Sequence, residues 1–278
     1  MDWVEGTGQK VEIGSIAELK LDPALDYLDA ENTRNYLDEN GSVSSELDIA
    51  SVYPVDDDWA VYFQYEEDGH ITDDEKDSID ADALLQSYKD GTEEQNKQLE
   101  NPADHLFIDG WELPPSYDEP SRTLSWTLRA HDGNNNPIVN QNVRILTRVG
   151  NMSVILVTDP AHLQEHATAI NDLVLSNLVV KEGQRYDDFD ESTDEKAGYG
   201  LTGLILGGVG VVAAKKLGLL ALIAVFAKKF GIVIVAAGAG LWSFLRGRSR
   251  KLKADTQEQQ VPAVNEEEKP NQNSNRLS

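Results

Sequence analysis

The pattern of hydrophobic and polar residues divides the chain into a mixed first part and a long apolar stretch. In residues 1–198, short runs alternate apolar and polar side chains or repeat apolar ones every three to four positions, which is typical of half-buried strands and helices. Residues 199–245 are apolar except for two lysine pairs, and the residues after 254 are polar. We therefore predict a globular domain over 1–198, a membrane anchor with a basic end over 199–253, and a disordered tail over 254–278.

Strand patterns dominate the globular part. The clearest strand is Trp59–Tyr65, because its aromatic and β-branched residues place Trp59, Val61, Phe63 and Tyr65 on one face. Three later runs separated by turn residues predict an antiparallel meander, and two short runs around Gly14-Ser15 predict a hairpin. These runs are Thr123–Ala130, Ile138–Thr147 and Met152–Thr158 in the meander, Val11–Ile13 and Ala17–Leu21 in the hairpin, and Leu178–Val180 as a last strand.

Helices are predicted where a capping residue precedes apolar residues at helical spacing. The sheet signals and helix signals together predict an α+β fold: a mainly antiparallel sheet with several helices, followed by a C-terminal transmembrane helix or helical hairpin. The helix signals are Asp29 before 30–39 with Tyr36 and Leu37 inward, Asp80 before a helix ending at Gly91, a Thr92/Gln95 capping box for a second helix to about Glu100, and Asp159-Pro160 before a stripe of Leu163, Ala167, Ile170 and Val174; Pro114-Pro115 marks a turn.

The apolar stretch permits two arrangements in a bilayer. Lys215-Lys216 and Lys228-Lys229 divide it into 199–214, 217–227 and 230–245. A helix over the first piece is about 24 Å long, whereas the hydrocarbon core is roughly 30 Å thick. One helix over 217–245 is long enough but puts Lys228 and Lys229 near the bilayer centre, at roughly 2.5–3.5 kcal/mol each. A hairpin avoids this cost, and a buried hairpin in a soluble fold is a third possibility. The residues expected at the membrane are Leu217, Leu220, Phe226, Phe230, Val233 and Trp242, with Arg246 and Arg248 on the cytoplasmic side.

Charge is distributed as unevenly as hydrophobicity. Residues 1–198 carry 44 acidic and 13 basic residues, whereas 199–253 carry nine basic residues and no acidic one. Such an acidic domain is a poor ligand for nucleic acid, whose phosphates need Lys and Arg, and anionic lipid headgroups repel it. The absence of cysteine excludes disulfides and thiolate chemistry. The expected partners are therefore a lipid bilayer and an envelope protein, with no nucleic acid and no cofactor.

One metal-binding pattern is present in a predicted helix. The run from His162 to His166 has the H-x-x-E-H form of inverted zinc peptidases, in which two histidines one turn apart reach a metal and Glu165 acts as a base. A third ligand would have to come from Glu182, Glu191 or Glu195. The alternative is that Leu163 and Ile170 use the buried face and that both histidines point to solvent.

Two acidic segments are further candidates for a cation. The segment from Gln64 to Glu75 partly fits a calcium loop through Asp68 and Glu75, although it can equally be a hydrated hairpin tip. The carboxylates between 187 and 195, Asp188 and Asp190 among them, are dense enough to raise one another's pKa and to bind Ca²⁺ or Mg²⁺, unless nearby Lys and Arg pair with them. No catalytic residue is identifiable from spacing.

Several stretches spread over residues 3–245 resemble a bacterial family of membrane-anchored proteins, which is itself a domain of unknown function. The resemblance implies a signal-led, extracytoplasmic domain at the inner membrane with a C-terminal anchor, although residues 1–5 lack the basic and apolar regions of a signal peptide. The lack of a recognisable catalytic pattern, together with the anchor, favours a non-enzymatic interaction or envelope-organising role, with a metal-dependent or other envelope hydrolase as the alternative. The stretches are Asp57-Asp58-Trp59, Asp68-Gly69, Asp73-Asp74, Asp82–Leu85, Gly91–Glu94, Gly110-Trp111, Pro114-Pro115, Leu156–Pro160, Tyr186–Phe189, Thr193-Asp194 and Tyr199–Leu201.

Overall fold

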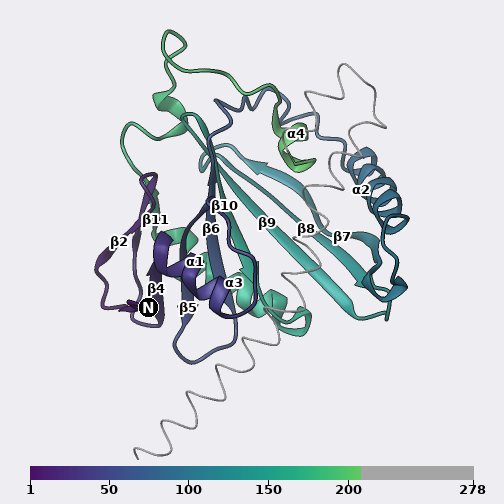
Figure 1. Cartoon of the computed structure of the whole chain (residues 1–278). Helices are drawn as coiled ribbons and strands as arrows, with labels where there is room; N and C mark the ends of the chain where they lie inside the picture. Colours follow the sequence, from purple (N-terminus) through teal and green to yellow (C-terminus); the bar gives the residue numbers. More distant parts are fainter. Residues whose placement is uncertain (208–278) are drawn as a thin grey trace, which may run out of the picture.

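The computed structural model describes residues 1–207, which form two antiparallel sheets with helices on both faces of the larger one (Figure 1). The larger sheet has the strand order β1-β4-β5-β6-β10-β9-β8-β7, and the smaller has the order β11-β3-β2. The α+β prediction with a mainly antiparallel sheet is therefore confirmed. In chain order the elements are β1 (Val4–Glu5), β2 (Lys10–Ile13), β3 (Ala17–Lys20), β4 (Leu25–Asp29), α1 (Ala30–Glu39), β5 (Asp48–Pro54), β6 (Ala60–Glu66), α2 (Ala81–Asn96), η1 (Pro102–Asp104), β7 (Leu106–Asp118), β8 (Thr123–Asp132), β9 (Pro137–Thr147), β10 (Gly150–Val157), η2 (Pro160–His162), α3 (Leu163–Leu173), η3 (Leu175–Asn177), β11 (Leu178–Val180), η4 (Tyr186–Asp188) and α4 (Leu201–Ile205).

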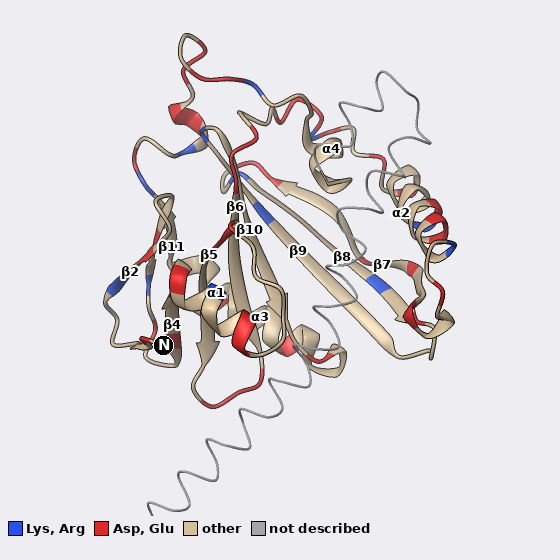
Figure 2. Ribbon diagram, in the orientation of Figure 1, with Lys and Arg blue, Asp and Glu red and all other residues tan. Residues whose placement is uncertain are grey.

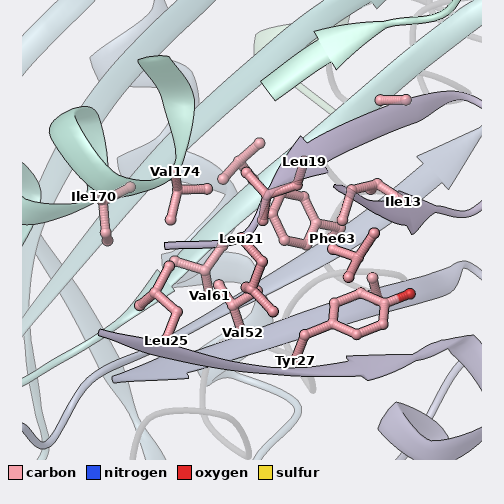
Figure 3. Close-up of a cluster of buried hydrophobic side chains, with 14 of the residues drawn as sticks. Ile13, Leu19, Leu21, Leu25, Tyr27, Val52, Val61, Phe63, Ile170 and Val174 are labelled. Atoms are coloured by element: carbon pink, nitrogen blue, oxygen red, sulfur yellow. The ribbon is translucent and has the colours of Figure 1, made fainter. Parts of the chain in front are cut away.

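The main core lies between the smaller sheet with α3 and one face of the larger sheet (Figure 3). Alternate residues of β6, Val61 and Phe63, are fully buried there, as expected for a strand with one face in a core. Ile170 and Val174 pack onto them from the region of α3. The prediction that Trp59, Val61, Phe63 and Tyr65 share one face of this strand is therefore confirmed.

The opposite face of the larger sheet is covered at its two ends. Helix α1 packs Tyr36 and Leu37 over Tyr53 and Tyr62 at one end, where the rings meet edge to face. Helices α2 and α4 pack over β8 at the other end. Ile155 of β10 packs with the cluster under α1, and Trp126 of β8 packs with the cluster under α2 and α4. Both residues pair with Asn142 of β9, and directly paired residues point to the same face of a sheet. The two helix-covered ends therefore belong to one face.

Local signals for the first helix and the meander are confirmed. Asp29 caps α1, because its carboxylate accepts a hydrogen bond from the Asn32 backbone N–H at 2.9 Å. The strands β8, β9 and β10 pair in sequence order, and β2 pairs with β3 as the predicted hairpin. Each of these elements is specified by residues close together in the chain, and for that reason the sequence pattern was sufficient to predict it.

The prediction of a turn at Pro114-Pro115 is wrong. Both prolines lie inside β7, the longest strand, whose register against β8 shifts between Leu113 and Ser116. Neither proline has a register partner in β8, and β7 is the edge strand of the larger sheet; bulges and edge strands are the places where a sheet tolerates proline. Tertiary position therefore permits two residues that are otherwise typical of turns.

The predicted break between two helices at Gly91 is also wrong. Helix α2 continues through Gly91, which is buried. The Thr92 hydroxyl does not cap a new helix but donates a hydrogen bond back to the Tyr88 carbonyl at 2.8 Å. Packing of Leu84 and Tyr88 on one face thus holds a single helix together.

The folded domain extends beyond residue 198, which we predicted as its last residue. Leu201 and Leu204 of α4 are 0% and 3% exposed and belong to the core under α2. The Tyr88 hydroxyl donates a hydrogen bond to the Ile205 carbonyl at 2.6 Å. The start of the apolar stretch is therefore a core element of the domain, because the β8 side chains in the same cluster, Leu124, Trp126 and Leu128, are apolar.

The remaining anchor predictions fall outside the described residues. Residues 1–207 include no helix with the length and apolarity required to span a bilayer. The predicted disordered tail, the choice between one helix and a hairpin, and the expected membrane residues all lie beyond residue 207; these are Leu217, Leu220, Phe226, Phe230, Val233, Trp242, Arg246 and Arg248.

Candidate functional site

Two strand ends and a helix bring together the most unusual group of side chains in residues 1–207. Val157, the last residue of β10, pairs with Ala60, the first residue of β6, so the segments beyond them lie side by side. Asp159 caps the turn that follows by accepting a hydrogen bond from the Ala161 N–H at 2.8 Å. Helix α3 then returns over this corner and places His166 beside Asp57 and Asp58.

His166 is the centre of this group. Its side chain is 2% exposed, and its Nε2 lies 3.3 Å from Oδ2 of Asp57. Its Nδ1 is hydrogen-bonded to the Thr158 hydroxyl. Asp57 is held in turn by the Trp59 indole, whose Nε1–H donates to Oδ2 at 3.2 Å, and by the Asp58 backbone N–H, which donates to Oδ1 at 2.8 Å. The imidazole and the first carboxylate are therefore both fixed before any ligand arrives.

The expectation that both helix histidines point to solvent is wrong for His166 and correct for His162. The His162 side chain is 54% exposed, with its ring stacked on that of His166 at 5.5 Å between centroids. Helix α3 buries His166 together with Ile170, while Leu163 is only half-buried, so its buried stripe differs from the predicted one. Glu165 lies beside His162 on the exposed side of the helix, with its Oε2 3.6 Å from Nδ1 of His162.

The ligands expected to complete a zinc site with the two histidines do not gather there. The group that the described residues offer consists of Asp57, Asp58 and His166, with ligand atoms within 4.8 Å of one another. Glu182, Glu191 and Glu195 are not part of it, and Glu191 instead pairs with Lys196 at 2.6 Å. The sequence contained the missing signal, since Asp57-Asp58-Trp59 and Thr158 lie in two of the stretches that carried the family resemblance.

The predicted calcium loop has its carboxylates engaged in other contacts. Asp68 accepts a hydrogen bond from the Tyr199 hydroxyl at 2.5 Å, and burial raises the pKa of that tyrosine. Glu75 accepts from the Thr202 backbone N–H at 2.8 Å, at the start of α4. Both side chains fasten the end of the domain instead of converging on one point.

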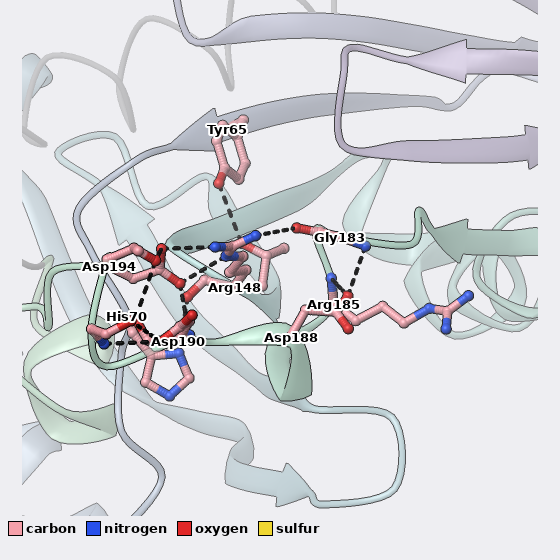
Figure 4. Close-up of polar contacts among 11 residues, drawn as sticks. Tyr65, His70, Arg148, Gly183, Arg185, Asp188, Asp190 and Asp194 are labelled. Carbon is pink, nitrogen blue, oxygen red and sulfur yellow. Dashed lines mark hydrogen bonds and ion pairs between the residues drawn. The ribbon is translucent and has the colours of Figure 1, made fainter.

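The acidic juncture before α4 is an internally bonded loop (Figure 4). The Arg148 guanidinium binds both carboxylate oxygens of Asp194, at 2.7 and 2.9 Å, and holds the pKa of Asp194 well below its ordinary value. Asp188 accepts hydrogen bonds from the backbone N–H groups of Gly183 and Arg185 at 2.9 and 3.0 Å. These contacts fold the chain back onto the turn between β9 and β10.

The prediction that crowding raises the pKa values of these carboxylates is wrong where a shift is resolved. Hydrogen bonds from Ser192 lower the pKa of Asp190, and Lys196 lowers that of Glu191. Local donors therefore outweigh the repulsion between like charges. Asp188 and Asp190 act as acceptors for the loop's own backbone and hydroxyl groups.

A second polar network attaches the same loop to the rim of the sheet. The Arg122 guanidinium bridges Asp73 and Asp187, each at 2.8 Å. It also lies over the Tyr186 ring, 4.6 Å from the centroid. Asp73 receives a hydrogen bond from the Tyr117 hydroxyl at 3.1 Å, so its charge is fully partnered. This arrangement is structural in character.

Two side chains on the helix-covered face of the sheet have buried polar atoms without a hydrogen bond among residues 1–207, Nε in Arg144 and both amide atoms in Asn151. Asn151 is 0% exposed, and neither its amide nitrogen nor its amide oxygen makes a hydrogen bond. Arg144 forms no ion pair there, although its guanidinium lies 5.9 Å from the Trp126 ring centroid. Burial lowers the pKa of Arg144. Buried polar atoms without a hydrogen bond lower the free energy of unfolding, so both side chains destabilise the described fold.

The other face carries a hollow of about 680 Å³ between β8–β9 and the α3–β11 region. Val143, Ile145, Ala167 and Leu178 give it an apolar lining. The side-chain oxygen of Gln141 faces the same region and has no hydrogen-bond partner among the described residues.

The fold and these sites define a class of protein: an acidic α+β domain on an eight-stranded antiparallel sheet, with a buried histidine beside two aspartates and an apolar stretch that begins inside the core. The chain belongs to the family described as "Protein of unknown function (DUF2167)", whose model matches residues 5–239. The resemblance to an uncharacterised family is thereby confirmed.

Other comparisons add little to this assignment. No curated protein matches the chain. Among solved structures, the chain is similar to the solution structure of cyanobacterial PsbP (CyanoP) from Synechocystis sp. PCC 6803, at 11% identity and a TM-score of 0.36, over 65% of this chain and 92% of that one. This likeness is too distant to support a functional argument.

Proposed function

We propose that the protein is a membrane-anchored, non-enzymatic domain of the bacterial envelope that binds another envelope protein through its acidic surface. The docking of α4 into the core carries this proposal. Leu201, Leu204 and Ile205 are the first turn of the long apolar stretch, and they are at most 3% exposed inside the domain. The stretch that suits a bilayer is thus continuous with the core.

This continuity supports a fixed orientation of the domain at the membrane. The chain leaves the described structure directly after Gly207, and residues 208–245 contain four lysines and no acidic residue. A flexible linker would let the domain tumble, whereas a docked helix holds one side of it near the bilayer. With Arg246 and Arg248 in the cytoplasm and one crossing, the domain lies on the extracytoplasmic side.

The acidic surface supports a partner with excess positive charge. Asp and Glu residues occur on α1, on α2 and along the connecting loops (Figure 2). Glu93 and Glu94 lie in the last turns of α2, where Lys97 pairs with Glu94 at 3.0 Å. A surface of one charge sign attracts an oppositely charged partner. Salt weakens this attraction, because the Debye length is about 8 Å at physiological ionic strength.

The topology is testable with the full chain because it has no cysteine. Val43, which is 85% exposed, and Ser278 each accept a single cysteine, as Val43→Cys and Ser278→Cys. The expected result is recovery in the membrane fraction, labelling of Val43→Cys by a membrane-impermeant maleimide in intact spheroplasts, and labelling of Ser278→Cys only after lysis. Recovery of the full chain in the supernatant without detergent would refute the anchor.

Partner binding is testable by crosslinking in the same membranes. Charge reversal by Glu93→Lys and Glu94→Lys should reduce a specific crosslinked product, and raised salt should reduce it in the same way. The matched control is Lys97→Glu, which makes the same helix more acidic. A product that responds to neither change contradicts binding through the acidic surface.

A further inference from the structure

We propose that Asp57, Asp58 and His166 form a binding site for a first-row divalent transition-metal ion, with Zn²⁺ as the best fit. The three ligand atoms lie within 4.8 Å of one another. Bond lengths of roughly 2.0–2.1 Å in a tetrahedral zinc site place neighbouring ligand atoms about 3.3 Å apart. Nε2 of His166 and Oδ2 of Asp57 already have this separation, 3.3 Å.

The contacts of His166 leave room for a cation between it and Asp57. Nδ1 of His166 is hydrogen-bonded to the Thr158 hydroxyl, and either tautomer of the imidazole satisfies this contact. When Nδ1 carries the proton and donates it to Thr158, the lone pair of Nε2 faces Oδ2 of Asp57 at 3.3 Å. A metal ion bound to both atoms uses this tautomer and removes the repulsion between the two acceptors.

The surroundings resemble the support that metal ligands usually receive. Trp59 fixes Oδ2 of Asp57 and the Asp58 backbone fixes Oδ1, so the carboxylate does not have to be ordered on binding. Asp58 makes no side-chain hydrogen bond or ion pair with other residues in the 1–207 range, and its carboxylate is available to close on the ion. One buried ligand and one exposed ligand, His166 at 2% and Asp57 at 45%, give the ion a path from solvent.

Three protein ligands leave the fourth position of a tetrahedral ion open. A water molecule can occupy it, as in zinc sites that react with small molecules. His162 is the side chain next to it, stacked on the His166 ring. A shift of its imidazole would make it the fourth ligand, in which case the site is closed and structural. The number of protein ligands therefore separates a reactive site from a structural one.

The test is metal binding by the purified full chain in detergent, after treatment with a chelator. Titration with Zn²⁺ against a chromophoric chelator should give one equivalent, and Co²⁺ should give the visible absorption of a tetrahedral site. Asp58→Asn should weaken Zn²⁺ binding at least tenfold. Thr158→Val should weaken it about 10- to 100-fold with the stoichiometry unchanged, because it removes only the support of His166.

The matched control is His131→Ala. His131 also pairs with an aspartate, since its Nδ1 lies 2.9 Å from Oδ1 of Asp109. Within residues 1–207 no third potential ligand lies close enough to this pair to complete a metal site. Zn²⁺ affinity should not change in this variant. Circular dichroism spectra of the Asp58→Asn and Thr158→Val proteins should match that of the unaltered chain. Less than half an equivalent of bound Zn²⁺, or an affinity that Asp58→Asn leaves unchanged in a folded protein, overturns the proposal.

Discussion

The docking of α4 predicts that the beginning of the apolar stretch stabilises the domain. Leu204 is 3% exposed and lies in the core formed by α2 and β8. Leu204→Ala removes a buried isobutyl group and leaves a cavity, which costs about 2–5 kcal/mol of the free energy of unfolding. For a domain of this size, a loss of about 3 kcal/mol lowers the melting temperature by roughly 6–12 °C.

The assay is thermal and urea unfolding of the full chain in detergent, followed by tryptophan fluorescence. Trp126 and Trp111 belong to the same cluster as Leu204 and report on its unfolding directly. The control is Leu113→Ala, which makes the same change on the edge strand β7, where the side chain is 58% exposed. That variant should remain within about 0.5 kcal/mol of the unaltered protein.

One result would refute the reasoning. If Leu204→Ala has the same unfolding curve as Leu113→Ala, α4 contributes nothing to the core, and the apolar stretch begins in lipid as the sequence suggested. A pair of truncations gives an independent check. A chain ending at Gly207 keeps α4 and should unfold cooperatively, whereas one ending at Gly198 lacks it and should melt at a lower temperature.

Three further predictions concern single contacts. Because Arg148 depresses the folded-state pKa of Asp194, the pair stabilises the domain above the ordinary value near pH 4, and this contribution is lost as the pH falls from there toward the folded-state pKa. Asp194→Asn should flatten the pH dependence of the urea midpoint in that range, and an unchanged slope contradicts the pairing. Gly69→Ala should destabilise more than Gly41→Ala, because both have positive φ but only the Gly69 Cβ would meet backbone atoms at 2.9 Å; equal melting temperatures would exclude that contact. Arg144→Met should leave the free energy of unfolding unchanged or raise it by about 1–4 kcal/mol, since a buried cation without an ion pair is replaced by an apolar side chain; a loss above about 1 kcal/mol would contradict this account of Arg144.

Elements fixed by neighbouring residues were predictable, whereas those that depend on position in the sheet were not. The cap at Asp29 and the alternation in β6 involve groups within a few residues of each other. The prolines of β7 are acceptable because no strand lies beyond that edge. Nothing within β7 itself carries that information.

The candidate metal site shows the same division. The histidine pattern singled out His166, whereas the side chains next to it come from just before β6 and just after β10. Only the antiparallel pairing of these strands brings Asp57 and Thr158 to the helix. Spacing along the chain instead suggested nearby glutamates, which use their charge elsewhere or lie outside the group.

The sequence by itself determined the α+β class, the acidic character of the domain and the presence of a long apolar stretch, because composition and periodicity set which side chains avoid water. The tertiary structure decided which surface each element covers. It turned His166 inward, engaged Asp68 and Glu75 in fastening the chain end, and placed Leu201 and Leu204 in the core. These outcomes depend on contacts between residues far apart in the chain, and such contacts exist only once the sheet has formed.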